Sequence, residues 1–155
     1  MSEIDFGSIL YKLYHGEVKL EDAALKDNKS CTDLTVNELN LIECIRGLTK
    51  NSEGPSISAI ASELDITRPS TTVAVNKLCA KKMTEKEGSS NDGRSVRVKL
   101  TAKGEKAYAA HHSFQNGLVK DIKRSMSEDE YKVLTASLSK LKEFFDAKLE
   151  NVNEE

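Results

Sequence analysis

Apolar residues recur at spacings of three and four along most of the chain, and in one short segment the spacing falls to two. The first spacing places side chains on one face of an α-helix, and the second places them on one face of a β-strand. Segments with helical spacing open near residues 3, 35, 56, 67, 101 and 127, and the alternating segment spans residues 95–100. The pattern predicts a mainly α-helical α+β fold with one small β-ribbon.

Two short helices are predicted next to each other in the middle of the chain. Ser56 is a suitable N-cap for a helix whose apolar positions recur over residues 57–64. Thr67 offers a second N-cap, followed by Pro69 in the first turn, where the missing N–H costs least. This order of helix, tight turn and helix indicates a helix-turn-helix.

The second of these helices, from Arg68 to about Lys82, is expected to expose small polar and basic side chains. Val73, Val75 and Leu78 are expected to face the core. The remaining surface carries Arg68, Ser70, Thr71, Thr72, Asn76 and Lys77. A DNA major groove admits one helix, and such side chains hydrogen-bond to base edges and phosphates. The helix is therefore a candidate recognition helix, although the same residues also suit an ordinary solvent-exposed face.

The alternating segment predicts a strand that follows a hairpin tip. One face carries Val96, Val98 and Leu100, and the other carries Ser95, Arg97 and Lys99. The preceding residues 88–93 are rich in glycine and polar residues, as hairpin tips are. Arg94 lies beside the tip, where its guanidinium suits the negative potential of a minor groove, and Asp92 can orient it. Simple solvation of both charges is the alternative.

The order helix, turn, helix, Asp92-Gly93-Arg94 and then Val98-Lys-Leu-Thr-Ala-Lys-Gly104 resembles the MarR family of bacterial transcription regulators. The resemblance implies a single MarR-like domain over residues 1–155, with a winged helix-turn-helix over 35–100 that binds double-stranded DNA. It also implies a homodimer held by helices within residues 1–30 and 101–155. The expected DNA-binding residues are Ser56, Thr67, Arg68, Ser70, Thr71, Thr72, Asn76, Lys77, Asp92, Arg94 and Arg97.

The resemblance has one closer match and one departure. Residues 71–78 and 33–45 are further similar to the fatty-acid-biosynthesis repressors of the family. The family usually has a glycine at the end of the recognition helix, where this sequence has Lys82. Glycine suits the left-handed backbone of a helix end, so Lys82 is expected to shift or lengthen the helix.

Charge is distributed unevenly along the chain. The net charge is −2, but residues 66–100 hold eight basic and three acidic residues, which gives +5 and leaves −7 for the other 120 residues. Phosphate attraction acts locally, because physiological salt screens charges over about 8 Å. A basic face on an acidic body can therefore still bind a duplex.

Long amphipathic helices are predicted at both ends of the chain, and a capping box at residues 127–130 opens the last one. Few surfaces within one chain remain to cover their apolar stripes, so we expect a homodimer. The expected dimerisation residues are Phe6, Leu134, Leu138, Leu141, Phe145 and Leu149. The resemblance also implies a pocket for a small apolar or aromatic effector among the first, second and fifth helices. Its candidate residues, which suit plain core packing at least as well, are Leu10, Leu13, Tyr14, Leu41 and Ile45.

The sequence indicates no metal, cofactor or catalytic site. His111 and His112 are adjacent and point about 100° apart on a helix, and no nucleophile or phosphate-binding motif is present. Three cysteines without a C-x-x-C pair argue against a disulfide framework, and Cys31, in a polar segment near Lys29, is the candidate for a reactive thiol. The sequence has neither a long apolar run nor a secretion signal, so we expect a cytoplasmic protein.

Three functions fit this pattern. The favoured one is a homodimeric DNA-binding regulator, in the role of a repressor, whose affinity for its site is modulated by a small molecule. The second is a winged-helix scaffold whose basic face binds an acidic protein partner. The third, within the family, is an acyl-chain-responsive regulator of lipid synthesis. None of the three is an enzyme.

Overall fold

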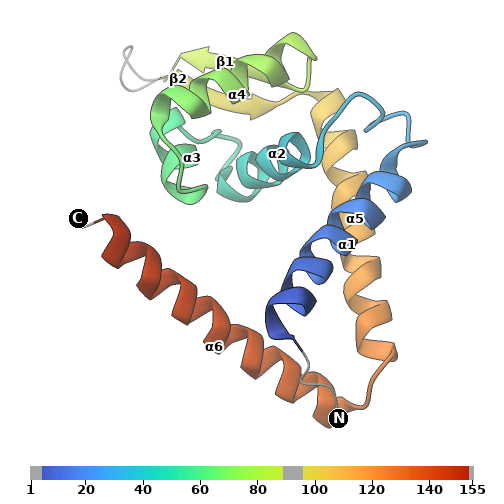
Figure 1. Ribbon diagram of the computed structural model, residues 1–155. Helices are drawn as coiled ribbons and strands as arrows, with labels where there is room; N and C mark the ends of the chain where they lie inside the picture. Colours follow the sequence, from blue (N-terminus) through green and yellow to red (C-terminus); the bar gives the residue numbers. More distant parts are fainter. Residues whose placement is uncertain (1–4, 89–95, 154–155) are drawn as a thin grey trace. The chain divides into compact units, whose positions relative to one another are not determined.

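The computed structural model describes residues 5–88 and 96–153, which form two compact units, Met1–Phe114 and Gln115–Glu155. The elements, shown in Figure 1, are α1 (Phe6–Leu25), α2 (Val36–Leu48), α3 (Ile57–Glu63), α4 (Arg68–Ala80), β1 (Thr84–Gly88), β2 (Val96–Leu100), α5 (Ala102–Arg124) and α6 (Glu128–Asn153). None of the described helices is both long enough and apolar enough to cross a membrane.

The helices of the first unit begin where capping residues stand in the sequence. Thr35 opens α2 as a full capping box, because its hydroxyl accepts from the Glu38 N–H and its own N–H donates to the Glu38 carboxylate. The Ser56 hydroxyl accepts from the Ala59 N–H, and the Thr67 hydroxyl accepts from the Ser70 N–H. The predicted starts of these three helices are confirmed.

The core of the first unit lies where α2, α3, α4 and the strands meet, at the upper end of the molecule in Figure 1. Its fully buried side chains are aliphatic for the most part, which gives the helix-turn-helix an apolar floor. The largest apolar ones are Ile42, Ile45, Ile60, Val75, Leu78, Met83 and Val98. This packing fixes α4 against the rest of the unit.

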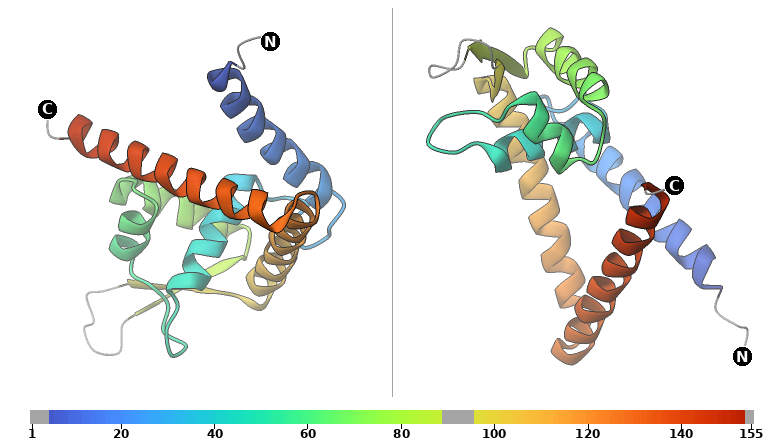
Figure 2. Two further views of the ribbon diagram at one scale, coloured as in Figure 1. Left: turned by 90° about the horizontal axis from the view of Figure 1, so that it is seen from below. Right: turned by 90° about the vertical axis from the view of Figure 1, so that its left-hand side faces the viewer.

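The ribbon is an antiparallel pair in which Thr84 lies opposite Leu100 and Gly88 opposite Val96. The segment before α3 lies along β2, because the Val98 N–H donates to the Pro55 carbonyl at 2.9 Å and Ser56 bridges to Arg97. The left view of Figure 2 shows the turn between α2 and α3 beside β2. The strands are therefore anchored at the start of the helix-turn-helix.

The tight turn between α3 and α4 uses a left-handed residue that is not glycine. Asp65 has φ 51°, its N–H points to the Ser62 carbonyl, and the Ile66 N–H donates to the Ala61 carbonyl at 3.0 Å. These two bonds form a Schellman motif, which ends a helix abruptly. The chain thereby changes direction at Asp65 and Ile66, and Thr67 then caps α4.

The second unit contains the end of α5 and the whole of α6. The capping box predicted at 127–130 is confirmed, because the Ser127 hydroxyl accepts from the Glu130 N–H and the Ser127 N–H donates to the Glu130 carboxylate. An open, mainly apolar groove of about 420 Å³ lies between these two helices. Its lining consists of Val119, Ile122, Tyr131, Leu134, Thr135, Leu138, Ser139 and Lys142.

Candidate nucleic-acid interface

One face of α4 is exposed along its whole length. Arg68, Ser70, Asn76 and Lys77 lie on this face, as the sequence pattern predicts. The opposite face packs into the core through Val75 and Leu78, which are fully buried. The helix therefore presents basic and small polar groups outward while its inner face is held rigidly.

Two positions of α4 differ from the prediction. Val73 was expected in the core, but 55% of it is exposed, and Thr71 was expected on the surface, but it is fully buried. The reason is the helical period: Thr71 and Val75 are four residues apart and share a face, whereas Val73 is about 200° from either. The Thr71 hydroxyl donates to the Thr67 carbonyl at 3.0 Å, which satisfies it inside the core. Thr71 is therefore unsuited to DNA contact, and Val73 offers a methyl surface.

The hydroxyls near the start of α4 are partly committed to the helix itself. Thr72 is half-buried and donates to the Arg68 carbonyl at 2.9 Å. The Thr67 hydroxyl donates a hydrogen bond to the Ser70 hydroxyl at 2.9 Å. Ser70 thus keeps its own proton to donate, while Thr72 and Thr67 are better placed as acceptors.

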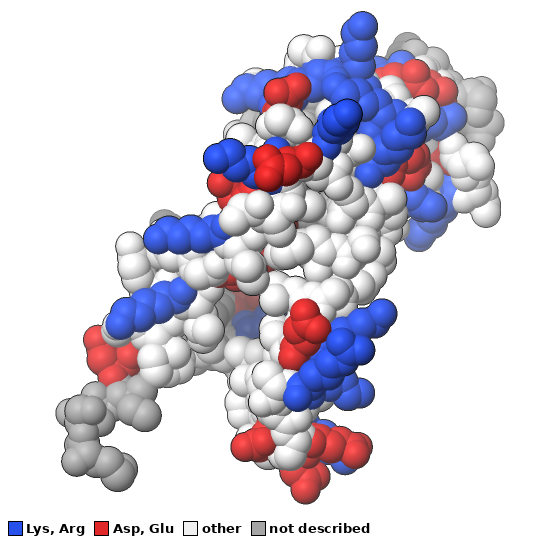
Figure 3. Space-filling model, turned by 90° about the vertical axis from the view of Figure 1, so that its right-hand side faces the viewer, with Lys and Arg blue, Asp and Glu red and all other residues white. Residues whose placement is uncertain are grey.

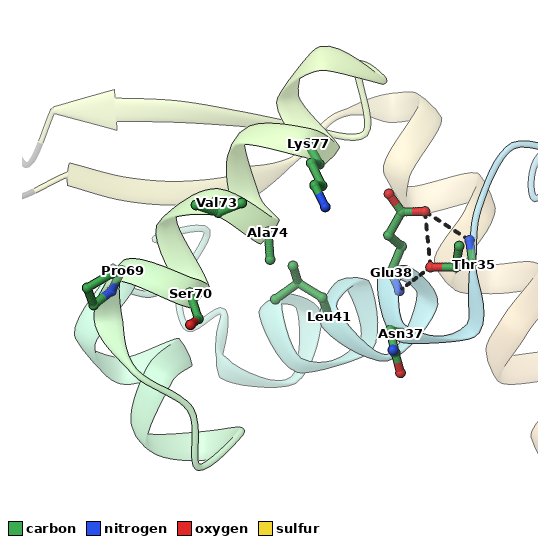
Figure 4. A pocket seen from close by; sticks show the side chains of 9 residues that line it. All are labelled: Thr35, Asn37, Glu38, Leu41, Pro69, Ser70, Val73, Ala74 and Lys77. Atoms are coloured by element: carbon green, nitrogen blue, oxygen red, sulfur yellow. Dashed lines mark hydrogen bonds between the residues drawn. The ribbon is translucent and has the colours of Figure 1, made fainter.

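An open groove of about 570 Å³ runs between α2 and α4, beside the exposed face. Figure 4 shows Leu41 and Ala74 facing each other across it, with Ser70 toward one end and Lys77 near Glu38 toward the other. Val73 also lines the groove. The groove separates α4 from α2 along one side of the exposed face of α4.

Several of the basic residues counted from the sequence are held in ion pairs. Lys81 contacts Glu38 at 2.7 Å, Arg97 Nε contacts Glu53 at 3.3 Å, and Lys99 contacts Glu87. The others in the described ranges, Arg68, Lys77, Lys82 and Lys86, have no acidic partner there. Figure 3 shows Lys and Arg side chains, with acidic ones among them, gathered at the end that holds α4 and the strands. The positive field therefore comes from fewer residues than the sequence count indicates.

The ion pair of Lys81 shifts the titration of its partner. Burial alone would raise the pKa of the Glu38 carboxyl, but hydrogen bonds from Lys81 and from the Thr35 backbone outweigh it and lower that pKa below its ordinary value. Glu38 stays ionised and ties the end of α4 to the start of α2. Lys81 also donates to the Asp33 carbonyl.

The remaining predicted DNA-binding residues divide into three cases. Ser56 is half-buried and serves as the cap of α3, and Arg97 is partly buried beside Glu53. Asp92 and Arg94 lie outside the described residues. Val73 and Lys86, which contacts Asn76, were absent from the predicted set.

The residues predicted for an effector pocket are not gathered in one place. Ile45 is part of the core, Leu41 borders the groove beside α4, and Leu13 is exposed. Tyr14 lines a separate cavity of about 410 Å³ between α1 and α2, together with Glu17 and other residues of both helices. Leu10 is half-buried on α1.

A buried polar cluster joins α1, α2 and α5. The His111 ring is fully buried between two carboxylates, with Nε2 at 2.5 Å from Glu21 and Nδ1 at 3.2 Å from Glu43. His112 approaches the other oxygen of Glu43 at 3.1 Å. Burial raises the pKa of Glu21, and His111 opposes that shift. The two histidines therefore serve as contacts between helices.

Cys31 is buried, although its polar sequence neighbours suggest an exposed position. Only 3% of Cys31 is exposed, and its Sγ contacts the Ala107 carbonyl at 3.9 Å. Burial, with a smaller effect of Glu21, raises the pKa of this thiol, and burial raises the pKa of Cys44 to about 11. Both thiols stay protonated at neutral pH, whereas reactive cysteines are thiolates.

These features, a helix-turn-helix with an exposed second helix and a two-stranded ribbon beside it, define a winged-helix DNA-binding protein. Residues 34–104 match a family model described as a winged helix DNA-binding domain. A comparison with curated protein sequences finds no match.

Solved structures extend the likeness beyond the winged helix. FabT of Streptococcus pneumoniae in complex with DNA is similar with a TM-score of 0.82 and 26% identity, covering 91% of this chain and 95% of that one. The MepR–DNA complex of S. aureus is similar with a TM-score of 0.76 and 20% identity, covering 92% of this chain and 99% of that one. The apo form of MarR from E. coli is similar with a TM-score of 0.65 and 21% identity, covering 90% of this chain and 98% of that one. Over nearly its whole length the chain is therefore similar to winged-helix transcription regulators of the MarR type.

Proposed function

We propose that this protein is a homodimeric repressor that binds a specific double-stranded DNA sequence and responds to a small molecule. The observation that carries the proposal is the exposed face of α4, where Arg68, Ser70, Asn76 and Lys77 are held outward by a buried inner face. Such groups suit the base edges and phosphates of a major groove. The DNA complexes of FabT and MepR support the same use of this fold.

Dimer formation is proposed from the apolar surface of the second unit. Leu134, Leu138, Phe145 and Leu149 are each at least 36% exposed, and Leu141 is half-buried. Burying such side chains yields about 25 cal/mol per Å² of apolar area. A two-fold dimer would place two copies of α4 in successive major grooves about 34 Å apart, which multiplies specificity on a palindromic site.

Response to a small molecule is proposed from the cavity between α1 and α2. Its walls combine Tyr14, Val18 and Leu34 with the carboxylates of Glu17 and Asp22. A ligand there can change DNA affinity only if it binds the DNA-competent and incompetent states with different affinity. Because the proposed target is double-stranded DNA, we infer a cytoplasmic location for the protein.

The test is a mobility shift with a duplex that spans the region upstream of the protein's own coding sequence. We expect a shifted complex whose affinity falls steeply with salt, because phosphate contacts release counterions. No complex at low salt would contradict the proposal. In the same assay Arg94→Ala is expected to weaken binding to all duplexes, whereas Ser70→Ala and Asn76→Ala are expected to change which duplex is preferred.

Repression is tested separately, with a reporter driven by the same upstream region. Expression of the protein is expected to lower reporter output, and Asn76→Ala is expected to restore it. Higher reporter output on expression would indicate an activator instead.

A further inference from the structure

Asn76, on the exposed face of α4, is not free to turn. The Lys86 ammonium on β1 donates to its Oδ1 at 2.6 Å. Both residues are exposed, so this contact lies at the surface that α4 would present to DNA. A second side-chain contact between this helix and this strand joins Cys79 Sγ to Thr84 Oγ1 at 3.3 Å.

The two contacts follow from the periods of the two elements. Asn76 and Cys79 are three residues apart on α4 and share a face, while Thr84 and Lys86 are two apart on β1 and share a face. Thr84 is almost fully buried at 3% exposure, and it anchors the strand beside Cys79. The next outward position of that strand face is Lys86, which therefore reaches Asn76.

The chemistry of the pair fixes the orientation of the amide. An ammonium group only donates hydrogen bonds, whereas an amide has one accepting oxygen and one donating NH₂. Asn76 must therefore turn its oxygen to Lys86, and its NH₂ group is left for other partners. The amide therefore presents its two N–H donors, and not its oxygen, to any further partner.

We propose that Lys86 is a specificity-determining residue that acts through Asn76 and makes this position prefer guanine over adenine. Guanine shows two acceptors, N7 and O6, in the major groove, which match a pair of donors. Adenine is read by asparagine through N7 and the N6 amino group, and that pairing requires the amide oxygen. Lys86 competes for this oxygen. The inference rests on the proposed DNA binding by α4.

The experiment uses the full-length protein and a selected duplex. Asn76→Ala first identifies the base pair whose preference relaxes, and four duplexes that differ only there are then titrated by fluorescence anisotropy. We expect the wild type to bind the guanine duplex best. Lys86→Met is expected to shift the affinity ratio of guanine to adenine toward adenine by about fivefold or more, the range of one bidentate base contact. Lys86→Arg, which still donates, is expected to keep the wild-type ratio.

A second set of variants, built on Asn76→Ala, distinguishes positioning of the Asn76 amide from a general effect of the Lys86 charge. With Asn76→Ala already present, Lys86→Met is expected to leave the ratio unchanged, because the amide through which Lys86 acts is gone. If Lys86 only contacts a phosphate, Lys86→Met will weaken all four duplexes equally and reduce the salt slope by about one, which overturns the inference but not the proposed function. If the wild type prefers none of the duplexes, both the inference and the proposed function are overturned. Circular dichroism of each variant verifies that it folds.

Discussion

Lys82 occupies the position at the end of α4 where the backbone turns left-handed, with φ 59°. Its N–H donates to the Cys79 carbonyl, and the Met83 N–H donates to the Leu78 carbonyl, each at 2.9 Å. This is a Schellman motif, closed by the buried side chains of Leu78 and Met83. The helix therefore ends at Ala80 without lengthening, and Lys82 bears the cost of a conformation that a side chain disfavours by about 1–2 kcal/mol.

Replacing Lys82 by glycine should therefore stabilise the protein. Glycine removes the left-handed penalty but adds conformational freedom to the unfolded chain, so the net gain is expected to be about 0.5–1 kcal/mol. Urea unfolding of Lys82→Gly and of Lys82→Ala measures it. The alanine variant removes the charge and retains the strain, so an equal gain in both would show that charge, and not backbone conformation, is the cause.

The residues of α4 show what the sequence predicts at this scale and what it does not. The caps at Thr35, Ser56 and Thr67 are predictable because each depends on groups within three residues. The positions of Thr71 and Val73 are harder to predict, because their hydrophobicity and their helical phase indicate opposite faces of α4. The contact of Lys86 with Asn76 joins residues ten apart in different elements, and local patterns do not specify it.

At the scale of elements, the end of α4 is tied to the start of α2 through Glu38 and Lys81. Glu38 has a pKa lower in the folded chain than its ordinary value of 4.5. A group of this kind contributes stability at pH values above its unfolded pKa and loses that contribution as the pH falls through its folded pKa. The contribution is therefore complete at neutral pH and is lost as the pH falls below 4.5 and through the lower pKa of the folded chain.

Glu38→Gln tests this linkage. Glutamine can still accept from the N-cap but cannot form the ion pair, so we expect a loss of about 1 kcal/mol at pH 7. The difference from wild type should shrink as the pH is lowered from 5 toward 3, because the wild-type carboxylate is then protonated. Unfolding by urea at each pH measures the difference, and a constant difference across that range would contradict the assignment.

The start of α5 packs against the turn that follows α4, at a position that only glycine fits. A Cβ at Gly104 would lie 2.0 Å from the Met83 carbonyl oxygen. This close approach connects α5 to the turn after α4, so the placement of the ribbon depends on it.

Gly104→Ala is therefore expected to destabilise the protein by about 2 kcal/mol, because the backbone must move to admit a methyl group. Gly47→Ala in α2 is the matched control. Nothing lies within 4 Å of a Cβ at Gly47, and alanine favours a helix, so this variant should gain about 0.5 kcal/mol. Thermal unfolding of the two variants compares them, and equal effects would contradict the packing described.

At the scale of the whole molecule, the order and type of the described helices and of β2 follow from apolar periodicity and capping residues, whereas β1 has no apolar alternation and is a strand through its pairing with β2. The distribution of charge on the folded surface does not follow from such local patterns. Arg97 pairs with Glu53 and Lys81 with Glu38, and these partners are more than 40 residues apart in the sequence. Counting charges along the chain therefore overstated the basic face, since it cannot reveal which cations are already neutralised.

The dimer prediction also belongs to this scale. Leu138→Glu places a charge in the apolar groove of the second unit and is expected to reduce the mass in solution from about twice 17.1 kDa to 17.1 kDa. Lys140→Glu adds the same side chain two positions along α6, at an exposed site, and should leave the mass unchanged. Light scattering after gel filtration measures both. A monomeric wild type, or a Leu138→Glu variant with undiminished mass, would contradict a dimer built on this groove.

The central claim is that paired copies of α4 recognise one DNA sequence, and selection from random duplexes tests it most directly. Repeated binding and amplification with the wild-type protein should enrich an inverted repeat whose half-site centres lie about 10 base pairs, one helical turn, apart. Asn76→Ala should relax the choice at one symmetric pair of positions within that repeat. A pool that stays random after selection, or enrichment without two-fold symmetry, would contradict the account.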